Sequence, residues 1–297
     1  MFEVMEGVPL IVRVNEFADR RANPNVPWTP EQIAVDAAAC ADAGASAVHF
    51  HGRSAEGAGD HSAATLSRTL ELIADACELV TYCTLGAGTD LDRHERLATL
   101  TEAAIRPDLA PVDLGSFNLD PFDPETSRFL IEEGLYVNTV GMVHYLAKGI
   151  VGAGVVPSAV AWSVGSLRML GALLDEGSWP TPVFAELVVS DRLLVTNPAT
   201  RAGLEQLATY LPEVPVTWTV MCAGGSILPL VDAAVTLGGG LAFGLGDSPY
   251  TTLGGTPRNA EVVAAVVARL DALGRRPANP EELRARLGRD PDGVRAL

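Results

Sequence analysis

Short apolar runs alternate with longer segments of helical periodicity through most of this chain, and no other feature restricts its fold as strongly. Eight apolar or β-branched runs are predicted strands: Leu10–Val14, Ala47–His51, Val80–Thr84, Ala110–Leu114, Val155–Trp162, Val183–Val189, Val216–Met221 and Leu241–Leu245. Predicted helices lie between them: Glu31–Ala43, Ala64–Leu79, Arg93–Ala104, Ser166–Leu174, Arg201–Tyr210, Leu228–Leu237 and Ala260–Leu273. Such alternation is typical of an α/β protein with a parallel sheet, and eight units favour a closed (β/α)8 TIM barrel.

The length favours one domain over residues 1–297, because barrels of 250 residues or more commonly form a single unit. Helix-start signals support the division into units: Thr29, Pro30 and Gln32 form a predicted capping box at the first helix. Asn279 before Pro280 repeats this pattern near the C-terminus. We therefore expect a C-terminal helical extension, packed outside the barrel.

The composition argues against two classes of partner. A formal charge of -16 disfavours nucleic acid, since nucleic-acid binders usually present a concentrated basic face. The sequence has no run of about 18 apolar residues and no basic and apolar leader at its start, so neither a membrane span nor a signal peptide is predicted. A cytoplasmic location follows as the expectation. The four cysteines lack CxxC spacing, which disfavours a zinc ribbon or a disulfide framework.

Two histidines one residue apart end the second predicted strand, in the stretch "HFHGR". Alternation along a strand sends His49 and His51 to the same side, at the carboxyl end where barrel enzymes place their active sites. The pair is a candidate for metal binding, although zinc normally needs at least three protein ligands, and the alternative is two polar residues that close a strand. Arg53 follows and could bind an anionic substrate or pair with a loop carboxylate.

The last predicted strand leads into "GGGLAFGLGDSPY". Alternation places Ala242, Gly244 and Gly246 on one face and Phe243, Leu245 and Asp247 on the other. Small residues on one face leave room for a ligand, or fit the taper of a barrel interior. Asp247 lies at the predicted catalytic rim, where a carboxylate is either functional or a turn former.

Further polar residues follow or interrupt other predicted strands: Glu16, Thr84, Asp113, Ser116, Glu186 and Cys222. Among them, Asp113 and Ser116 are candidates for substrate binding. Glu186 interrupts an apolar strand, so its carboxylate is a base with raised pKa, a metal ligand or half of an ion pair. Gly224, Gly225 and Ser226 precede a predicted helix, where they could bind an anion or form a tight turn.

Four segments together resemble the β-keto acid cleavage enzymes, which include the 3-keto-5-aminohexanoate cleavage enzymes. They are "NPNVPWTPEQ", "AGASAVHFHGR", "GGGLAFGLGDS" and "TPRNAEVVAAVVARLDALGRRPANPEELRARLG", and they span essentially the whole chain. The resemblance implies an oligomeric (β/α)8 barrel that binds zinc through the two histidines and a glutamate of the last strand. It also implies cleavage of a small β-keto acid with acetyl-CoA, which yields acetoacetate and a new coenzyme A thioester.

Carried over by position, His49 and His51 match the zinc ligands of the family. Asp247 matches an acidic residue thought to act as a base. Glu16 lies near a glutamate of the first strand, and Thr84 falls where the family has a serine. These matches make Glu16, Thr84 and Asp247 the candidate catalytic residues.

This chain also departs from the family pattern. The family's last strand resembles G-G-H-x-R-x-G-x-E-D, but here Gly240, Ala242 and Gly246 replace its histidine, arginine and metal-binding glutamate. On the fifth strand, "PSAV" replaces an acidic P-E-x-E. The third zinc ligand is therefore missing, and its candidate replacements are Glu186, Cys222, Asp113 and Glu16. Arg13 and Arg53 are candidate replacements for the arginine.

Three hypotheses follow. The first is a zinc-dependent acyltransferase of the β-keto acid cleavage type with altered ligands and substrate. The second is another lyase, hydrolase or isomerase on this barrel that does not use coenzyme A. The third is a catalytically degenerate barrel that binds a small molecule or a partner, since function depends on the site and not on the fold.

Overall fold

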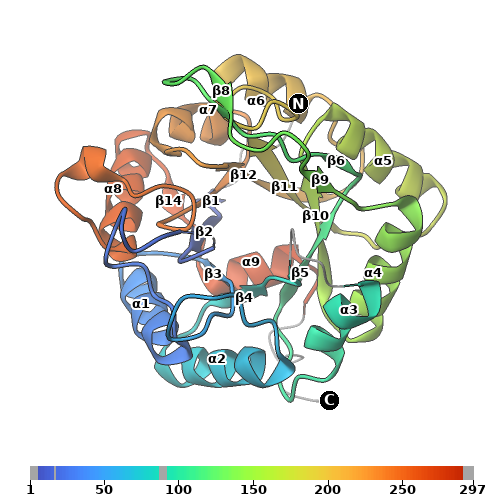
Figure 1. Ribbon diagram of the computed structural model, residues 1–297, viewed down its shortest axis with the longest axis horizontal. Coiled ribbons are helices and arrows are strands. Elements are labelled where there is room, and N and C mark those ends of the chain that lie inside the picture. Colours follow the sequence, from blue (N-terminus) through green and yellow to red (C-terminus); the bar gives the residue numbers. More distant parts are fainter. Residues whose placement is uncertain (1–5, 17, 87–91, 290–297) are drawn as a thin grey trace.

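The computed structural model describes residues 6–16, 18–86 and 92–289. Eight parallel strands form a closed barrel in the order β10-β11-β12-β13-β2-β3-β4-β5, which confirms the predicted fold (Figure 1). Their bounds are β2 Leu10–Arg13, β3 Ala47–Phe50, β4 Val80–Cys83, β5 Leu109–Asp113, β10 Val156–Ala161, β11 Val183–Val189, β12 Val216–Cys222 and β13 Gly240–Phe243. The predicted strands match these within one or two residues.

Helices form a ring outside the strands (Figure 1). They are α1 Pro30–Asp42, α2 Ala63–Ala76, α3 Arg93–Thr101, α4 Val140–Gly152, α5 Val164–Asp175, α6 Arg201–Ala208, η1 Leu228–Leu230 with α7 Val231–Thr236, and α8 Asn259–Ala272. The capping box of α1 is confirmed, because the Thr29 side chain accepts from the backbone N–H of Gln32. The sequence prediction did not include α4.

Buried side chains form two layers because strand residues alternate between the faces of the barrel wall. One layer fills the space between strands and helices and includes Val12, Val48 and Phe243. The other fills the barrel interior and includes Ile11 and Ala242. Ala242 therefore points inward, as alternation predicts.

The C-terminal helix α9 (Pro280–Arg286) does not pack on the outer surface of the ring, which corrects the expectation from the sequence. Leu283 and Leu287 join the interior cluster, and Arg284 donates to the carbonyl of Leu79, just before β4. The helix thus covers the base of the barrel, where it is visible through the centre in Figure 1. A short parallel pair, β1 (Gly7–Val8) with β14 (Arg276–Pro277), directly precedes this helix in the chain through β14.

An excursion between β5 and α4, residues 117–136, is here called the arm. It contains two antiparallel pairs, β6 (Phe117–Asn118) with β9 (Leu135–Tyr136), and β7 (Phe122–Asp123) with β8 (Arg128–Phe129). The arm leaves the carboxyl end of β5, so it lies at the face where barrel active sites form. The predicted elements did not include it, because its paired runs are only two residues long.

Within the described ranges, no helix is both long enough and apolar enough to cross a membrane.

Candidate functional site

A cavity of about 620 Å³ opens at the carboxyl ends of the strands. Such a volume suits a small-molecule site, and the position is the usual one for an active site in this fold. Side chains of β2, β3, β4, β5, β10, β11 and β12 and of the loops that follow the barrel strands line it, together with part of the arm. This cavity contains several of the residues predicted from the sequence, among them His49, His51 and Asp247.

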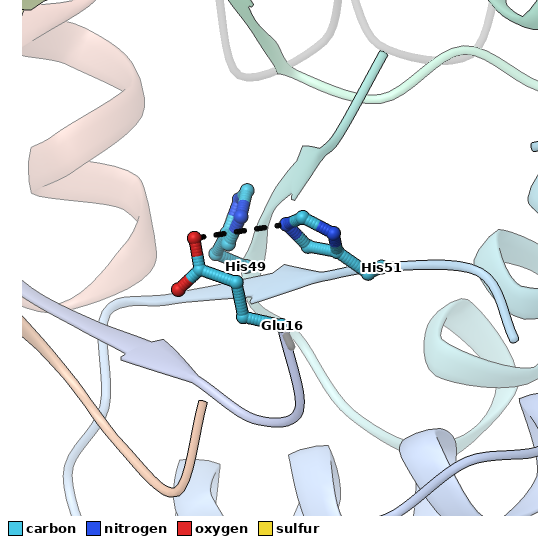
Figure 2. Close-up of side chains that lie close together, drawn as sticks. All are labelled: Glu16, His49 and His51. Carbon is cyan, nitrogen blue, oxygen red and sulfur yellow. Dashed lines mark ion pairs between the residues drawn. The ribbon is translucent and has the colours of Figure 1, made fainter. Parts of the chain in front are cut away.

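Three side chains converge in this cavity. One ligand atom from each of Glu16, His49 and His51 lies within 4.8 Å of those of the other two (Figure 2). The histidine rings are 5.2 Å apart between centroids, and Nε2 of His51 lies 4.0 Å from Oε1 of Glu16. Both histidines are buried and face the cavity, as alternation predicts. A glutamate from the end of the neighbouring strand completes a group of three.

The backbone around this group is tightly held. The fully buried Asn15 side chain donates to the carbonyl of His51 and accepts from its N–H, each at 2.9 Å. Glu16 itself has φ of 23°, in the left-handed region that glutamate rarely adopts. Strained residues of this kind persist where the surroundings over-determine them, often at functional sites. Asn15 therefore fixes the end of β2 against the end of β3.

The chemistry of the three donors fits zinc. Burial lowers the pKa of His49 well below 6.5 and that of His51 to about 3, so both imidazoles are neutral ligands. Burial would raise the pKa of Glu16, but the charges of Arg13 and His51 and its side-chain hydrogen bonds together lower it. Nδ1 of His49 is buried with no hydrogen-bond partner in the described part of the chain. Two neutral imidazoles and one carboxylate, with room for a fourth ligand, form a typical catalytic zinc set.

Arg13 on β2 connects this group to two other carboxylates. Its guanidinium lies 2.6 Å from Oε1 of Glu16, 2.9 Å from Oε1 of Glu186 and 3.1 Å from Oδ1 of Asp247. Arg13 is 3% exposed, so these contacts occur away from bulk water. Arg13 therefore supplies an arginine to the site, which the last strand of this chain lacks. Arg53, the other candidate replacement, is not part of the described lining.

The cluster would carry a net negative charge if all three carboxylates were ionised, because one guanidinium faces three carboxylates. Burial accordingly raises the pKa of Glu186 to about 7 and that of Asp247 well above its ordinary value, against the opposing charge of Arg13. A dication beside them would favour the ionised carboxylates. Glu186 thus has both an ion pair with Arg13 and a raised pKa, and among the described residues it does not belong to the metal-ligating group.

Gly246 supplies the space that Glu16 uses. A Cβ atom at this position would lie 3.0 Å from Cβ of Glu16 and 2.9 Å from the carbonyl oxygen of Arg13. Any larger residue here would displace the end of β2. The small residue at position 246 and the observed position of Glu16 are therefore two parts of one arrangement.

Asp247 corrects a detail of the alternation argument. It was expected on the face of Phe243, which points outward, yet it lines the cavity and contacts Arg13. The reason is that β13 ends at Phe243 and Gly244 adopts φ of 157°, so strand alternation does not continue to Asp247. The inward position is required for any catalytic role.

The other predicted residues divide into two groups. Thr84, Asp113 and Gly224 line the cavity. Ser116 is exposed and accepts from the N–H of Asn138, and Arg53 donates to the carbonyl of Ala18. Neither Ser116, Arg53, Gly225 nor Ser226 belongs to the described lining.

Cys222 does not join the metal-ligating group among the described residues, and neither do Glu186 and Asp113. Burial raises the pKa of the Cys222 thiol to about 12, which keeps it protonated and a poor metal ligand. Gly225 lies against this thiol, since a Cβ there would be 2.6 Å from Sγ. The thiol and Gly225 therefore have a packing role here.

Sequence reasoning missed several aromatic residues of the cavity. Tyr82 lies edge-on to His49 with centroids 4.5 Å apart. Phe117 and Tyr136 line the cavity from the arm, and Trp162 lines it directly after β10. Tyr82 and Trp162 stand in predicted strands, where an aromatic residue is ordinary core. No local signal distinguishes such a residue from one that faces a ligand.

Comparison of the sequence with known proteins identifies the family. Residues 9–288 match the model of the beta-keto acid cleavage enzyme family, so the chain belongs to this family and the resemblance is confirmed. A 3-keto-5-aminohexanoate cleavage enzyme of Acetoanaerobium sticklandii is 27% identical over 270 residues, which cover 90% of this chain and 92% of the relative. A 3-dehydrocarnitine:acetyl-CoA trimethylamine transferase of Rhizobium meliloti is also 27% identical, with 89% and 90% covered.

Among solved structures, the binary complex of ObcA with oxaloacetate superimposes with a TM-score of 0.69 at 17% identity. The match covers 89% of this chain and 67% of ObcA. At this identity the likeness supports the barrel fold alone.

Proposed function

We propose that this protein is a zinc-dependent acyltransferase that cleaves a β-keto acid with acetyl-CoA. The bond between the keto carbon and the adjacent methylene carbon breaks, and the acyl group joins the sulfur of coenzyme A. The acetyl group joins the methylene carbon, which gives acetoacetate. The observation that carries the proposal is the convergence of Glu16, His49 and His51 at the active-site face of a family member.

Zinc would be held by these three side chains, with Glu16 in place of the glutamate that the last strand lacks. Bound there, the ion supplies Lewis-acid polarisation of the keto group and stabilises enolate-like charge. Asn15 acts through the backbone of His51, so it is a positioning residue.

Asp247 is the candidate base. Its Oδ1 is oriented by Nε of Arg13, and burial raises its pKa, which makes the ionised carboxylate a stronger proton acceptor. Thr84 and Gly224 border the same cavity and are candidates for contacts with substrate. Arg13 orients the carboxylates of Glu16, Glu186 and Asp247 through its ion pairs with them.

The experiment measures metal and turnover in the same preparation. Protein purified without added zinc is analysed for metal, then incubated with acetyl-CoA and a set of β-keto acids, while acetoacetate and the new acyl-CoA are quantified. About one zinc per chain and equal amounts of the two products support the proposal.

Zinc with substrate cleavage but no acyl-CoA would instead indicate a lyase or hydrolase on this barrel. Protein without metal or turnover that is thermally stabilised by small ligands would indicate a binding barrel, since a ligand of the native state raises its stability. Either result contradicts the proposed transfer. The homo-oligomeric state and the cytoplasmic location stay predictions.

A further inference from the structure

The cavity has two chemically different sides. In the cyclic strand order, β10 lies four positions from β2 in either direction, and β5 lies four positions from β13. The metal-ligating group and Asp247 extend from β2, β3 and β13. The strands that face β13, β2 and β3 across the barrel are therefore β5, β10 and β11. β5 and β10 carry Asp113 and lead to Trp162, whereas β11 carries Glu186, whose carboxylate is already paired with Arg13.

The far side is built from apolar and aromatic side chains, here called the apolar wall: Phe117, Leu119, Ile131, Tyr136, Trp162 and Leu193. Phe117 packs against Trp162 with centroids 4.8 Å apart and against Tyr136 at 5.2 Å. These rings pack on one another, so they form a continuous surface. Four of the six residues belong to the arm, which places the wall beside the cavity mouth.

Asp113 is the carboxylate beside the rings of this side, and each of its oxygens already accepts a hydrogen bond. Oδ1 accepts from Nε1 of Trp162 at 2.8 Å, and Oδ2 accepts from the hydroxyl of Tyr136 at 2.5 Å. The buried Arg96 lies 3.9 Å from Oδ2 and offsets the charge. Asp113 thus orients the two rings and is poorly suited to bind a cationic ligand.

A second substrate carboxylate would also find little support there. The arginines that line the cavity in the described ranges are Arg13 and Arg192. Arg13 already contacts three carboxylates, whereas Arg192 is exposed at the rim. Asp123 is an acidic group near Arg192. A hydrogen bond from the Thr126 hydroxyl lowers the pKa of Asp123, and the charge of Arg192 makes a smaller contribution in the same direction.

From this arrangement, and resting on the proposed function, we propose that the substrate is a β-keto acid with an uncharged apolar chain or ring on its keto carbon. The keto and carboxylate groups lie at the metal side, and the apolar substituent extends across the barrel to the apolar wall. Burial of one methylene group supplies about a fourfold gain, so kcat/KM should rise about fourfold with each added methylene until the wall is reached.

Two matched pairs of substrates test the charge of the substituent. 3-Oxohexanoate and 3-oxoadipate share a six-carbon backbone and differ by a terminal carboxylate. 5,5-Dimethyl-3-oxohexanoate and 3-dehydrocarnitine have the same shape and differ by a quaternary nitrogen. We expect the uncharged member of each pair to have a kcat/KM at least about tenfold higher, because an unpaired charge is costly to bury. Equal or inverted preference in either pair overturns the proposal; preference for the quaternary ammonium would show that the rings act through cation–π contacts.

A variant pair locates the effect. Leu193→Lys places a cation on the apolar wall, while Leu194→Lys adds the same cation at the next residue, which is 55% exposed and outside the described lining. We expect Leu193→Lys to raise KM for 3-oxohexanoate about tenfold and to lower KM for 3-oxoadipate, with unchanged metal content. Leu194→Lys should change neither. If Leu193→Lys raises only the KM for acetyl-CoA, the wall holds the thioester and the proposal is wrong.

Binding without reaction separates this inference from the proposed function. In the absence of acetyl-CoA, thermal shifts of the purified protein are measured with 3-oxohexanoate and 3-oxoadipate, for wild type and Leu193→Lys. Turnover with a preference for charged substituents would contradict the inferred apolar substituent, while the proposed transfer reaction would still hold. Selective stabilisation by 3-oxohexanoate, lost in Leu193→Lys, would support the apolar wall even if no substrate is cleaved.

Discussion

The two sides of the cavity differ in what holds their side chains in place. On the β2–β3–β13 side, Arg13, Glu16 and Asp247 depend on one another through charge, and one change there disturbs all. On the β5–β10 side, the rings depend on packing and on hydrogen bonds to Asp113, and its charge is already offset by Arg96. In the proposed function, the charged side performs the chemistry and the apolar side selects the substrate, so variants of the two sides should fail differently.

The largest effect is expected for His49→Ala. Loss of one of three ligands should reduce zinc to well below one per chain and lower kcat/KM by more than about 100-fold, since even outer-shell changes cost 10- to 100-fold. Metal analysis and the acetoacetate assay check this. His144→Ala is the control, because His144 pairs with Glu176 on the outer helices. Full zinc content in His49→Ala would show that the metal lies elsewhere.

The next prediction tests the exchange between Glu16 and Gly246. Glu16→Gly should lose zinc, and Gly246→Glu alone should be poorly folded because its Cβ meets the end of β2. The double variant Glu16→Gly with Gly246→Glu removes the contact with Cβ of Glu16, so that only the backbone at the end of β2 has to shift, and it returns a carboxylate to the last strand. We expect it to regain zinc to near one per chain. Zinc retained in Glu16→Gly would rule out Glu16 as a ligand.

A smaller effect is expected on the apolar side. Leu119→Ala should raise KM for an apolar β-keto acid about tenfold, while kcat and zinc content change less than about twofold, since the lost contact binds ground state and transition state alike. Leu130→Ala, at a residue of the same arm that is 59% exposed, should have no effect. A large fall in kcat for Leu119→Ala would contradict the separation between the two sides.

The smallest effect is expected at the hydrogen bonds of Asn259, which hold the ends of β2 and β13 together behind the charged side. Asn259 donates to the carbonyl of Val14 and to Asp36, and accepts from the N–H of Leu245, which joins the ends of β2 and β13. Burial raises the pKa of Asp36 to about 6 from its ordinary 3.8. Because the unfolded chain releases this proton at lower pH, stability should fall as pH rises from about 4 to about 6 and stay lower above that.

Asp36→Asn keeps an acceptor for Asn259 and removes the ionisation. It should therefore flatten this pH dependence and raise stability at pH 8 by on the order of 2 kcal/mol, as measured by urea unfolding at several pH values. Asp42→Asn, an exposed change on the same helix, is the control. An unchanged slope in Asp36→Asn would show that Asp36 does not titrate in this range.

The barrel and the histidine pair were predictable because both depend on local periodicity. Strand and helix runs define the eight units, and alternation brings His49 and His51 to one side. The inward position of Asp247 was not predictable, since it depends on a turn at Gly244 that ends the alternation. The aromatic residues were not predictable as a wall, because Trp162 and Phe117 come from separate elements that only the arm brings together.

By itself, the sequence determined the family, the barrel and two of three metal-ligating candidates, together with the absence of the glutamate at Gly246. Only the tertiary structure decided which of Glu16, Glu186, Cys222 and Asp113 approaches the histidines. The physical reason is barrel closure. It pairs β13 with β2 across more than two hundred residues of sequence, so the space left at Gly246 is filled by a side chain from the neighbouring strand.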